Sequence, residues 1–186
     1  RLLIRAPFHE AASAGGMEVV VMPRMSFGTG HHATTWLMAR AVLDLGVVGR
    51  RGLDMGSGTG VLAIVAAKCG AMHVDAVDID DWADGSCREN IAANGVAEQI
   101  TPLLGDVRRI AGRSYDFILA NINRNILLAD MPAYAAALTP GGDLLMSGFL
   151  EQDIPVITEA AAKLGMMTVA TANRDGWMLV HVKKVS

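Results

Sequence analysis

The stretch that decides the fold is LDMGSGTG, residues 53–60, which carries glycine at positions 56, 58 and 60. It is followed by the helix-like stretch VLAIVAAKCG, residues 61–70, and preceded by a short apolar run. Glycine lets the backbone turn sharply and lets a ligand approach where a Cβ atom would collide. The sequence therefore predicts a ligand-binding loop between a strand and a helix.

The spacing of these glycines argues against the two common phosphate-binding loops. A dinucleotide fingerprint, G-x-G-x-x-G, would place its last glycine at position 61, which is Val61. A P-loop needs Gly-Lys-Ser/Thr, whereas Gly60 is followed by Val61 and Leu62. The loop is therefore expected to pack against a nucleoside or an amino acid without a pyrophosphate.

Acidic residues lie at the ends of the next two expected strands and favour a nucleoside as the ligand. Asp78 lies in the stretch AVDID, residues 76–80, about twenty residues after the glycine loop. A carboxylate at the tip of the second strand can accept hydrogen bonds from both ribose hydroxyls. Asp106 ends the stretch LLGD, residues 103–106, where a carboxylate can accept from an adenine amino group.

Composition sets broad limits on the function. The chain has 186 residues, slightly over half of them apolar, which is typical of one α/β domain with a buried core. A net charge of −3 offers no basic surface, so direct nucleic-acid binding is not expected. The apolar runs are strand-sized, so no membrane-spanning segment is expected. Cys69 and Cys87 lack any ligand spacing, which predicts free thiols in a reducing cytoplasm and no metal site.

From about residue 50 the chain alternates apolar runs with helix-like stretches, which predicts a mainly parallel sheet with helices on both faces. Strands are expected over residues 52–56, 73–80, 99–106, 115–123 and 141–149. Helices are expected over residues 61–70, 82–95, 125–138 and 150–165. The last two strands, residues 166–173 and 176–184, are expected to form a hairpin.

Three further local features are expected around this core. Ahead of it, the sequence predicts a strand over residues 18–23 and a glycine-broken loop over residues 25–35. A helix over residues 36–46 should follow, capped by Thr34 or Thr35. The run Pro140-Gly141-Gly142 predicts a turn before the strand that follows it.

The motifs, taken in order, resemble those of a known family. The stretches LDMGSGTG, VDID (residues 77–80), LLGD and ANIN (residues 120–123) are similar to those of S-adenosylmethionine-dependent methyltransferases with a Rossmann-like sheet. The stretch MSFGTGHHATT, residues 25–35, resembles the Phe-Gly-Thr-Gly-x-His-x-Thr-Thr signature of the ribosomal protein L11 methyltransferase family. The closing GWMLVHVKK, residues 176–184, resembles the Trp-containing last strand of that family, and the resemblance extends from about Glu18 to Lys184. Ala33 stands where many members have proline, and Asp81-Trp82 replaces the more usual Asp-Pro.

This resemblance implies a fold, a domain organisation and a cofactor. The implied fold is α/β, the Rossmann-like class I methyltransferase fold: a mainly parallel seven-stranded sheet with helices on both faces and an antiparallel C-terminal hairpin. One catalytic domain is implied, with the N-terminal strand and signature loop in residues 1–32 and the core in residues 33–186. A separate substrate-recognition domain is expected upstream of Arg1. The expected contacts of S-adenosyl-L-methionine are Thr35, Gly56, Gly58, Gly60, Asp78, Asp106 and Asn121.

The resemblance also implies a reaction, the methylation of amino groups on lysine side chains and the chain terminus of ribosomal protein L11. We expect the enzyme to be cytoplasmic, with a monomer favoured and no membrane partner. Methyl transfer from a sulfonium is an in-line displacement that depends mainly on alignment. Asn121, at the end of the fourth strand, can accept from the substrate amine and orient its lone pair, whereas Asn123 fits the cap of the following helix. His32, beside His31 in the signature, is expected to relay the proton or shape the amine pocket.

Three alternatives stay open from the sequence. The first is a methyltransferase acting on glutamine, a nucleic acid base or a small molecule. Amide and base methylases commonly carry Asn/Asp-Pro-Pro-aromatic after the fourth strand, and residues 121–124 here are Asn-Ile-Asn-Arg. The second is a non-catalytic module that only binds the cofactor. The third, an NAD-dependent oxidoreductase, is disfavoured by Val61.

Overall fold

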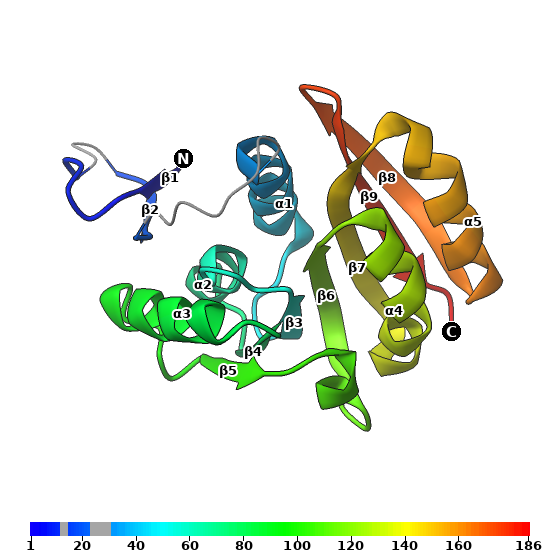
Figure 1. Ribbon diagram of the computed structural model, residues 1–186, viewed down its shortest axis with the longest axis horizontal. Helices are drawn as coiled ribbons and strands as arrows, with labels where there is room; N and C mark the ends of the chain where they lie inside the picture. The colour runs from blue at the N-terminus through cyan, green and yellow to red at the C-terminus, as the bar shows by residue number, and fades with distance from the viewer. Residues whose placement is uncertain (12–14, 23–30) are drawn as a thin grey trace.

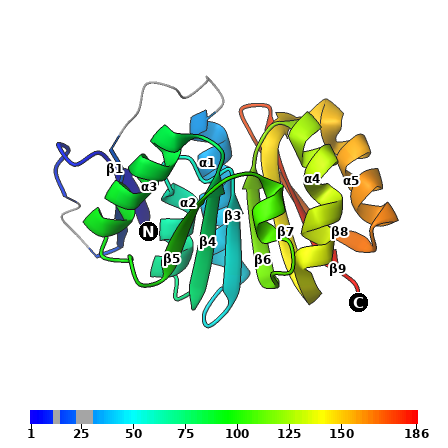
Figure 2. The same ribbon diagram turned by 60° about the horizontal axis from the view of Figure 1, so that its bottom comes forward.

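The computed structural model of the protein describes residues 1–11, 15–22 and 31–186, with the side chains of all of these except His31 and His32. Its main feature is a seven-stranded sheet in the order β5-β4-β3-β6-β7-β9-β8, which can be followed across Figure 2. The strands are β3 (Arg51–Met55), β4 (His73–Asp78), β5 (Ile100–Leu104), β6 (Tyr115–Asn121), β7 (Leu138–Leu150), β8 (Met166–Arg174) and β9 (Trp177–Lys184). Strand β9 runs in the opposite direction to the other six strands of this sheet, so the predicted mainly parallel sheet and C-terminal hairpin are confirmed.

In the part of the chain that the structure describes, five α-helices, labelled in Figure 1, and two short 3-10 helices connect the strands. The α-helices are α1 (His31–Leu45), α2 (Val61–Lys68), α3 (Asp81–Ala93), α4 (Arg124–Ala137) and α5 (Ile154–Lys163), and the 3-10 helices are η1 (Val107–Ile110) and η2 (Glu151–Asp153). Helices α1, α2 and α3 supply buried residues to one apolar core, and α4 and α5 supply them to another. The two cores lie on opposite faces of the sheet, because alternate side chains of a strand point to opposite faces.

Strand β6 demonstrates this alternation. Phe117 and Leu119 belong to the core beneath α1 and α2, whereas Ile118 and Ala120 belong to the core beneath α4 and α5. All four side chains are completely buried. A run of consecutive apolar residues is what a central parallel strand requires, since both of its faces are covered.

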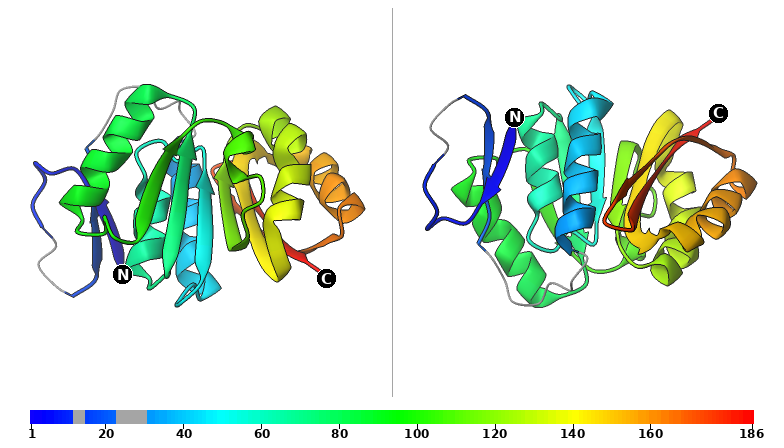
Figure 3. Two further views of the ribbon diagram at one scale, coloured as in Figure 1. Left: turned by 90° about the horizontal axis from the view of Figure 1, so that it is seen from below. Right: turned by 90° about the horizontal axis from the view of Figure 1, so that it is seen from above.

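The N-terminal strands form a separate parallel pair, β1 (Leu2–Arg5) with β2 (Met17–Val20). In both views of Figure 3 this blue pair lies beside the green helix α3. Val19 of β2 is completely buried in the core formed with α1 and α2. The side-chain ammonium of Lys68, in α2, donates to the carbonyl of Glu18. The strand predicted over residues 18–23 is thus present as β2, and β1 was not predicted.

Two sequence predictions are wrong in detail. Helix α1 begins at His31, so Thr34 and Thr35 lie inside it rather than capping it. The predicted turn at residues 140–142 lies within β7, where the pairing with β6 shifts register between Tyr115 and Phe117. Of the loop predicted over residues 25–35, residues 31–35 belong to α1 instead, and residues 25–30 lie outside the described residues. Among the described residues, no helix is both long and apolar enough to cross a bilayer.

Candidate functional site

The predicted site residues gather at the carboxyl ends of neighbouring strands. The glycine loop follows β3, Asp78 ends β4, Asp106 follows β5, and Asn121 ends β6. These four strands are adjacent and parallel in the sheet, so their carboxyl ends meet at one edge. In open α/β sheets ligands bind at this edge, which we call the carboxyl edge.

The glycine loop needs glycine for two different reasons. Gly58 and Gly60 have φ angles of 54° and 82°, in the left-handed region that other residues rarely adopt. A Cβ atom added to Gly60 would lie 2.7 Å from Cys87 Sγ, so Gly60 allows α3 to pack closely. A Cβ atom added to Gly58 would meet nothing within 4 Å, so this part of the loop faces open space. Gly58 is therefore the position where a ligand can approach the backbone.

Asp78 holds the glycine loop from the next strand. Its Oδ2 accepts a hydrogen bond of 2.8 Å from the backbone N–H of Gly58, and its Oδ1 accepts one of 3.0 Å from the N–H of Asp80. Among the described residues, no Lys, Arg or His forms an ion pair with it. Ile79, the next residue, is 69% exposed although it is apolar. A carboxylate and an exposed apolar side chain thus follow one another at this edge.

Asp54, inside β3, is a second carboxylate at this site that sequence reasoning missed. Its side chain is fully buried, and Oδ2 accepts a hydrogen bond of 3.1 Å from the N–H of Ala63 in α2. Burial raises the pKa of Asp54 to about 7, and the nearby charge of Asp78 adds to this rise, whereas the bond from Ala63 opposes it. An aspartate within the apolar run that precedes the glycines was the signal that could have revealed it.

Asp106 lies at the far side of the same edge and is already engaged. Arg108 donates to it from its backbone N–H, from Nε and from Nη2, at 2.8–3.1 Å. Hydrogen bonds from Arg108 lower the pKa of Asp106, so the carboxylate is ionised at neutral pH. Arg108 is highly exposed. Asp106 is therefore available to a ligand only in competition with, or alongside, Arg108.

Asn123 caps a helix, as expected, whereas the role predicted for Asn121 stays a prediction. The side chain of Asn123 accepts a hydrogen bond of 3.1 Å from the N–H of Ile126, so it caps α4 as predicted. Asn121 is half-buried at the end of β6, beside Ser147 of β7. Among the described residues, no side-chain hydrogen bond uses the Asn121 amide. That amide is free to contact a ligand or substrate at the carboxyl edge.

The signature residues are only partly described. Thr35 is buried in the second turn of α1. Next to it, the half-exposed Trp36 lies under the guanidinium of Arg174, 4.0 Å from the ring centre, which ties α1 to the tip of the β8–β9 hairpin. The side chain of His32 lies outside the described residues, so its predicted role stays a prediction.

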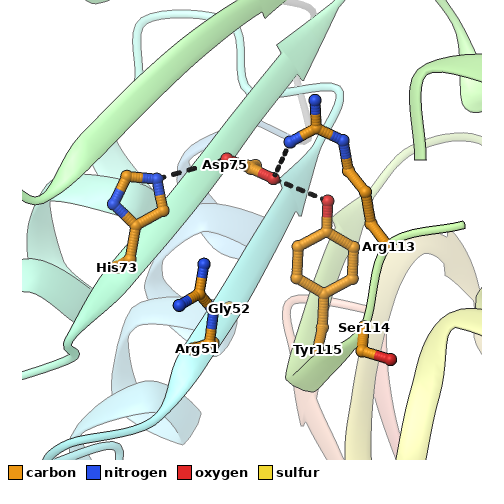
Figure 4. Close-up of a pocket in the computed structure, with 7 residues that line it drawn as sticks. All are labelled: Arg51, Gly52, His73, Asp75, Arg113, Ser114 and Tyr115. Carbon is orange, nitrogen blue, oxygen red and sulfur yellow. Dashed lines mark hydrogen bonds and ion pairs between the residues drawn. The ribbon is translucent and has the colours of Figure 1, made fainter.

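Two cavities lie at the opposite edge of the sheet, where the parallel strands begin. One of them, of about 290 Å³, is lined by Arg51, Gly52, His73, Asp75, Arg113, Ser114 and Tyr115 (Figure 4). Asp75 is buried there and accepts from Tyr115 Oη at 2.7 Å and Arg113 Nη1 at 3.0 Å, while His73 Nε2 lies 3.3 Å from it. Figure 4 shows these three side chains converging on Asp75, so its carboxylate oxygens already have partners within the protein.

The other cavity, of about 360 Å³, includes Arg50, Asp143, His181 and Lys183. Asp143 lies 2.7 Å from Arg50 Nη2 and 2.7 Å from His181 Nε2. These contacts join β7 to β9 and to the residue that precedes β3. The two cavities therefore mark structural ion-pair clusters, and none of the predicted site residues lines either of them.

Comparison with known proteins gives a consistent result. The family model described as Ribosomal protein L11 methyltransferase (PrmA) matches residues 1–185. A ribosomal protein L11 methyltransferase of Porphyromonas gingivalis is 48% identical over 178 residues, which cover 95% of this chain and 61% of that protein. One of Phocaeicola vulgatus is 46% identical over 181 residues, which cover 97% of this chain and 64% of that protein. The chain thus spans about three fifths of the length of these curated relatives.

Solved structures agree on the fold. The crystal structure of a ribosomal protein L11 methylase from Lactobacillus delbrueckii subsp. bulgaricus matches with a TM-score of 0.90 at 26% identity, covering 100% of this chain and 95% of that one. The structure of M. jannaschii TYW2 in complex with AdoMet matches with a TM-score of 0.66 at 18% identity, covering 86% and 77%. The second likeness bears on the fold alone.

Proposed function

This chain belongs to the ribosomal protein L11 methyltransferase family, and from that premise we propose that it binds S-adenosyl-L-methionine at the carboxyl edge and methylates amino groups of ribosomal protein L11. The single observation that carries this proposal is the arrangement of Asp78 with the glycine loop. The Gly58–Asp78 hydrogen bond places a carboxylate at a point where the backbone is open to a ligand.

The residues at this edge fit the nucleoside part of the cofactor. Each carboxylate oxygen of Asp78 accepts one backbone N–H, which leaves a lone pair on each for the two ribose hydroxyls. The exposed side chain of Ile79 offers an apolar surface to one face of the adenine ring. Asp106 would accept from the adenine amino group, and the Gly56–Gly60 loop would lie against the methionine part.

The reacting groups would meet near Asn121. When bound, S-adenosyl-L-methionine supplies a methyl group on a positively charged sulfonium. An amine must arrive neutral to act as a nucleophile, and for a lysine with a pKa near 10.4 this costs about 4–5 kcal/mol at pH 7. The Asn121 side-chain oxygen would accept a hydrogen from that amine and direct its lone pair. His32 would relay the released proton or shape the amine pocket.

The partner proposed here is a protein. Lysine side chains and the chain terminus of ribosomal protein L11 are the amines that we propose as acceptors, which places the reaction in the cytoplasm. A net charge of −3 supports a protein substrate over direct binding to nucleic acid. Residues 121–124, Asn-Ile-Asn-Arg, support an amine acceptor over an amide or a base. A monomer is the proposed state.

Methyl transfer to purified ribosomal protein L11, with radiolabelled cofactor, is the direct test. We expect transfer by the wild type and a loss in turnover of about a hundredfold in Asn121→Ala, with the cofactor dissociation constant changed less than threefold. Asn123→Ala is the matched control: it loses the α4 cap, at a cost of about 1 kcal/mol in stability, and should keep full turnover.

Other outcomes would redirect the proposal. Equal losses of turnover and affinity in Asn121→Ala would place Asn121 in cofactor binding rather than in catalysis. Cofactor binding without transfer to L11 would favour another substrate or a non-catalytic binding module. Binding of NAD, with none of S-adenosyl-L-methionine, would overturn the proposed function.

A further inference from the structure

Two asparagines at the C-terminal end of α3 hold the N-terminal segment through its backbone. Asn94, directly after α3, forms two hydrogen bonds with Val20: Oδ1 accepts from the N–H at 2.8 Å, and Nδ2 donates to the carbonyl at 2.6 Å. One helical turn earlier, Asn90 Oδ1 accepts from the N–H of Met22 at 3.1 Å. The spacing of four residues puts both amides on one face of α3. Together they fix the end of β2 and the two residues that follow it.

Asn90 has a second contact that Asn94 lacks. Its Nδ2 donates a hydrogen bond of 2.9 Å to the carbonyl of Thr59, which lies inside the glycine loop. Asn90 is 2% exposed and Thr59 is 3% exposed, so this bond is buried and water cannot replace it. One buried amide thus connects the glycine loop to the N-terminal segment.

The Thr59 end of this connection adjoins expected cofactor contacts. Thr59 lies between Gly58, whose N–H is bound by Asp78, and Gly60, whose φ angle of 82° depends on glycine. Met22 is the last described residue before residues 23–30, which join it in the sequence to α1 and Thr35. A displacement of Thr59 would therefore act on the backbone that Asp78 binds.

We propose that Asn90 is a positioning residue for cofactor binding, which couples the glycine loop to the N-terminal segment through the Thr59–Asn90–Met22 hydrogen bonds. This inference rests on the proposed function, because it requires that the glycine loop binds S-adenosyl-L-methionine. Asn90 is too deeply buried to touch the cofactor itself. It acts by fixing two backbone segments relative to each other.

The coupling between the glycine loop and the N-terminal segment must be reciprocal. If the N-terminal segment stabilises the glycine loop, a ligand that orders the loop must stabilise the N-terminal segment by the same factor. The N–H of Met22 reports on this effect, because its acceptor is Asn90. The N–H of Val20 is bound by Asn94 and serves as an internal reference in the same segment.

The first test compares Asn90→Ala with Asn94→Ala by calorimetric titration of S-adenosyl-L-methionine. Both variants lose hydrogen bonds to the N-terminal segment, and only Asn90→Ala also releases the glycine loop. We expect a dissociation constant at least tenfold higher in Asn90→Ala and within about threefold of wild type in Asn94→Ala. Equal weakening in the two variants would overturn the coupling, since anchoring of the segment alone would then suffice.

The second test uses the wild type, so it does not depend on whether a variant folds. Hydrogen–deuterium exchange is measured with and without saturating S-adenosyl-L-methionine. We expect exchange at the Met22 N–H to slow at least fivefold on binding, with less change at Val20. Binding by calorimetry without added protection at Met22 would overturn the inference and leave the proposed function intact. No binding by the wild type would overturn both.

Discussion

Aspartates at the two edges of the sheet have different kinds of hydrogen-bond partner. Asp75 and Asp78 lie three residues apart on β4. Asp75, near the start of the strand, is contacted by the side chains of Arg113, Tyr115 and His73. Asp78, at its end, is bound by two backbone N–H groups and, among the described residues, by no cationic side chain. A carboxylate that is already contacted by side chains of the protein stabilises the fold. A carboxylate held only by backbone N–H groups can still bind a ligand.

Asp143 and Asp54 show a related contrast, because their pKa values shift in opposite directions. Burial disfavours the charge of Asp143, yet hydrogen bonds from His181 and Arg50 overcome it and bring its pKa down to about 2. Burial also disfavours the charge of Asp54, and the single bond from Ala63 does not overcome it, so its pKa rises to about 7. The difference comes from the cationic and imidazole partners that only Asp143 possesses.

The largest effect on stability is expected from removing the carboxylate at the amino ends of the strands. Asp75→Ala should lower the free energy of unfolding by about 3–5 kcal/mol, because it removes the acceptor of the hydrogen bonds from Arg113 and from the buried Tyr115 hydroxyl. Urea unfolding measures this loss. The affinity of the folded variant for S-adenosyl-L-methionine should stay within about twofold of wild type.

Tyr115→Phe is the milder companion to that variant. It removes one hydrogen bond to Asp75 and should cost about 1 kcal/mol. A large loss of cofactor affinity in folded Asp75→Ala, with Tyr115→Phe unaffected, would contradict the separation of the two edges.

The matching change at the carboxyl edge should affect binding instead. Asp78→Ala should weaken the affinity for S-adenosyl-L-methionine about a hundredfold, or about 2.7 kcal/mol, because it removes the ribose acceptors and releases Gly58. Asp80→Ala is the control: Asp80 precedes α3 but forms no side-chain cap, so affinity should change less than twofold. Calorimetric titration separates the two. Similar behaviour of the two variants would remove Asp78 from the proposed site.

Much of this comparison could be predicted from the sequence. The glycine spacing and the strand–helix alternation predicted the parallel sheet. Asp78 and Asn121 could be placed at strand ends because each lies at the end of an apolar run in the sequence. The cap at Asn123 followed from its position before a helix-like run, and its hydrogen bond to Ile126 confirms it. These features depend on local sequence and on the period of the strands.

The remaining features depend on contacts between distant residues. Asn90 looks like an ordinary helical asparagine until the fold brings Thr59 and Met22 to it, from positions 31 and 68 residues away. The Asp75 cluster likewise joins residues up to 40 apart. Thr35 was placed at a helix cap because threonine favours that position, yet α1 begins four residues earlier. Local propensity does not reveal where tertiary contacts extend a helix.

The contrast between Asp143 and Asp54 should appear in the pH dependence of stability. The folded-state pKa of Asp143 is below its ordinary value of 3.8, so its stabilisation is complete above that pH and is lost as the pH falls toward 2. The expected loss is about 2 kcal/mol. Urea unfolding at intervals from pH 2 to pH 5 measures it, and Asp143→Asn should flatten this part of the profile.

Asp54 should act with the opposite sign. Its folded-state pKa is raised, so between about pH 4 and pH 7 the folded protein keeps a proton that the unfolded chain has lost, and stability falls as the pH rises. Asp54→Asn should remove this slope and leave the acid limb set by Asp143 unchanged. A variant that instead flattens the acid limb would show that the two carboxylates titrate together.

The smallest effect is expected from breaking the ion pair between Asp106 and Arg108. This carboxylate lies at the carboxyl edge but has a cationic partner, Arg108, which is highly exposed. Because an exposed ion pair in water is weak, Arg108→Ala should leave the urea midpoint unchanged. It should tighten S-adenosyl-L-methionine binding about twofold, since Asp106 would no longer divide its lone pairs between Arg108 and the adenine amino group. Weakening of more than tenfold would mean that Arg108 itself contacts the ligand, and that a cationic partner at this edge serves binding rather than stability.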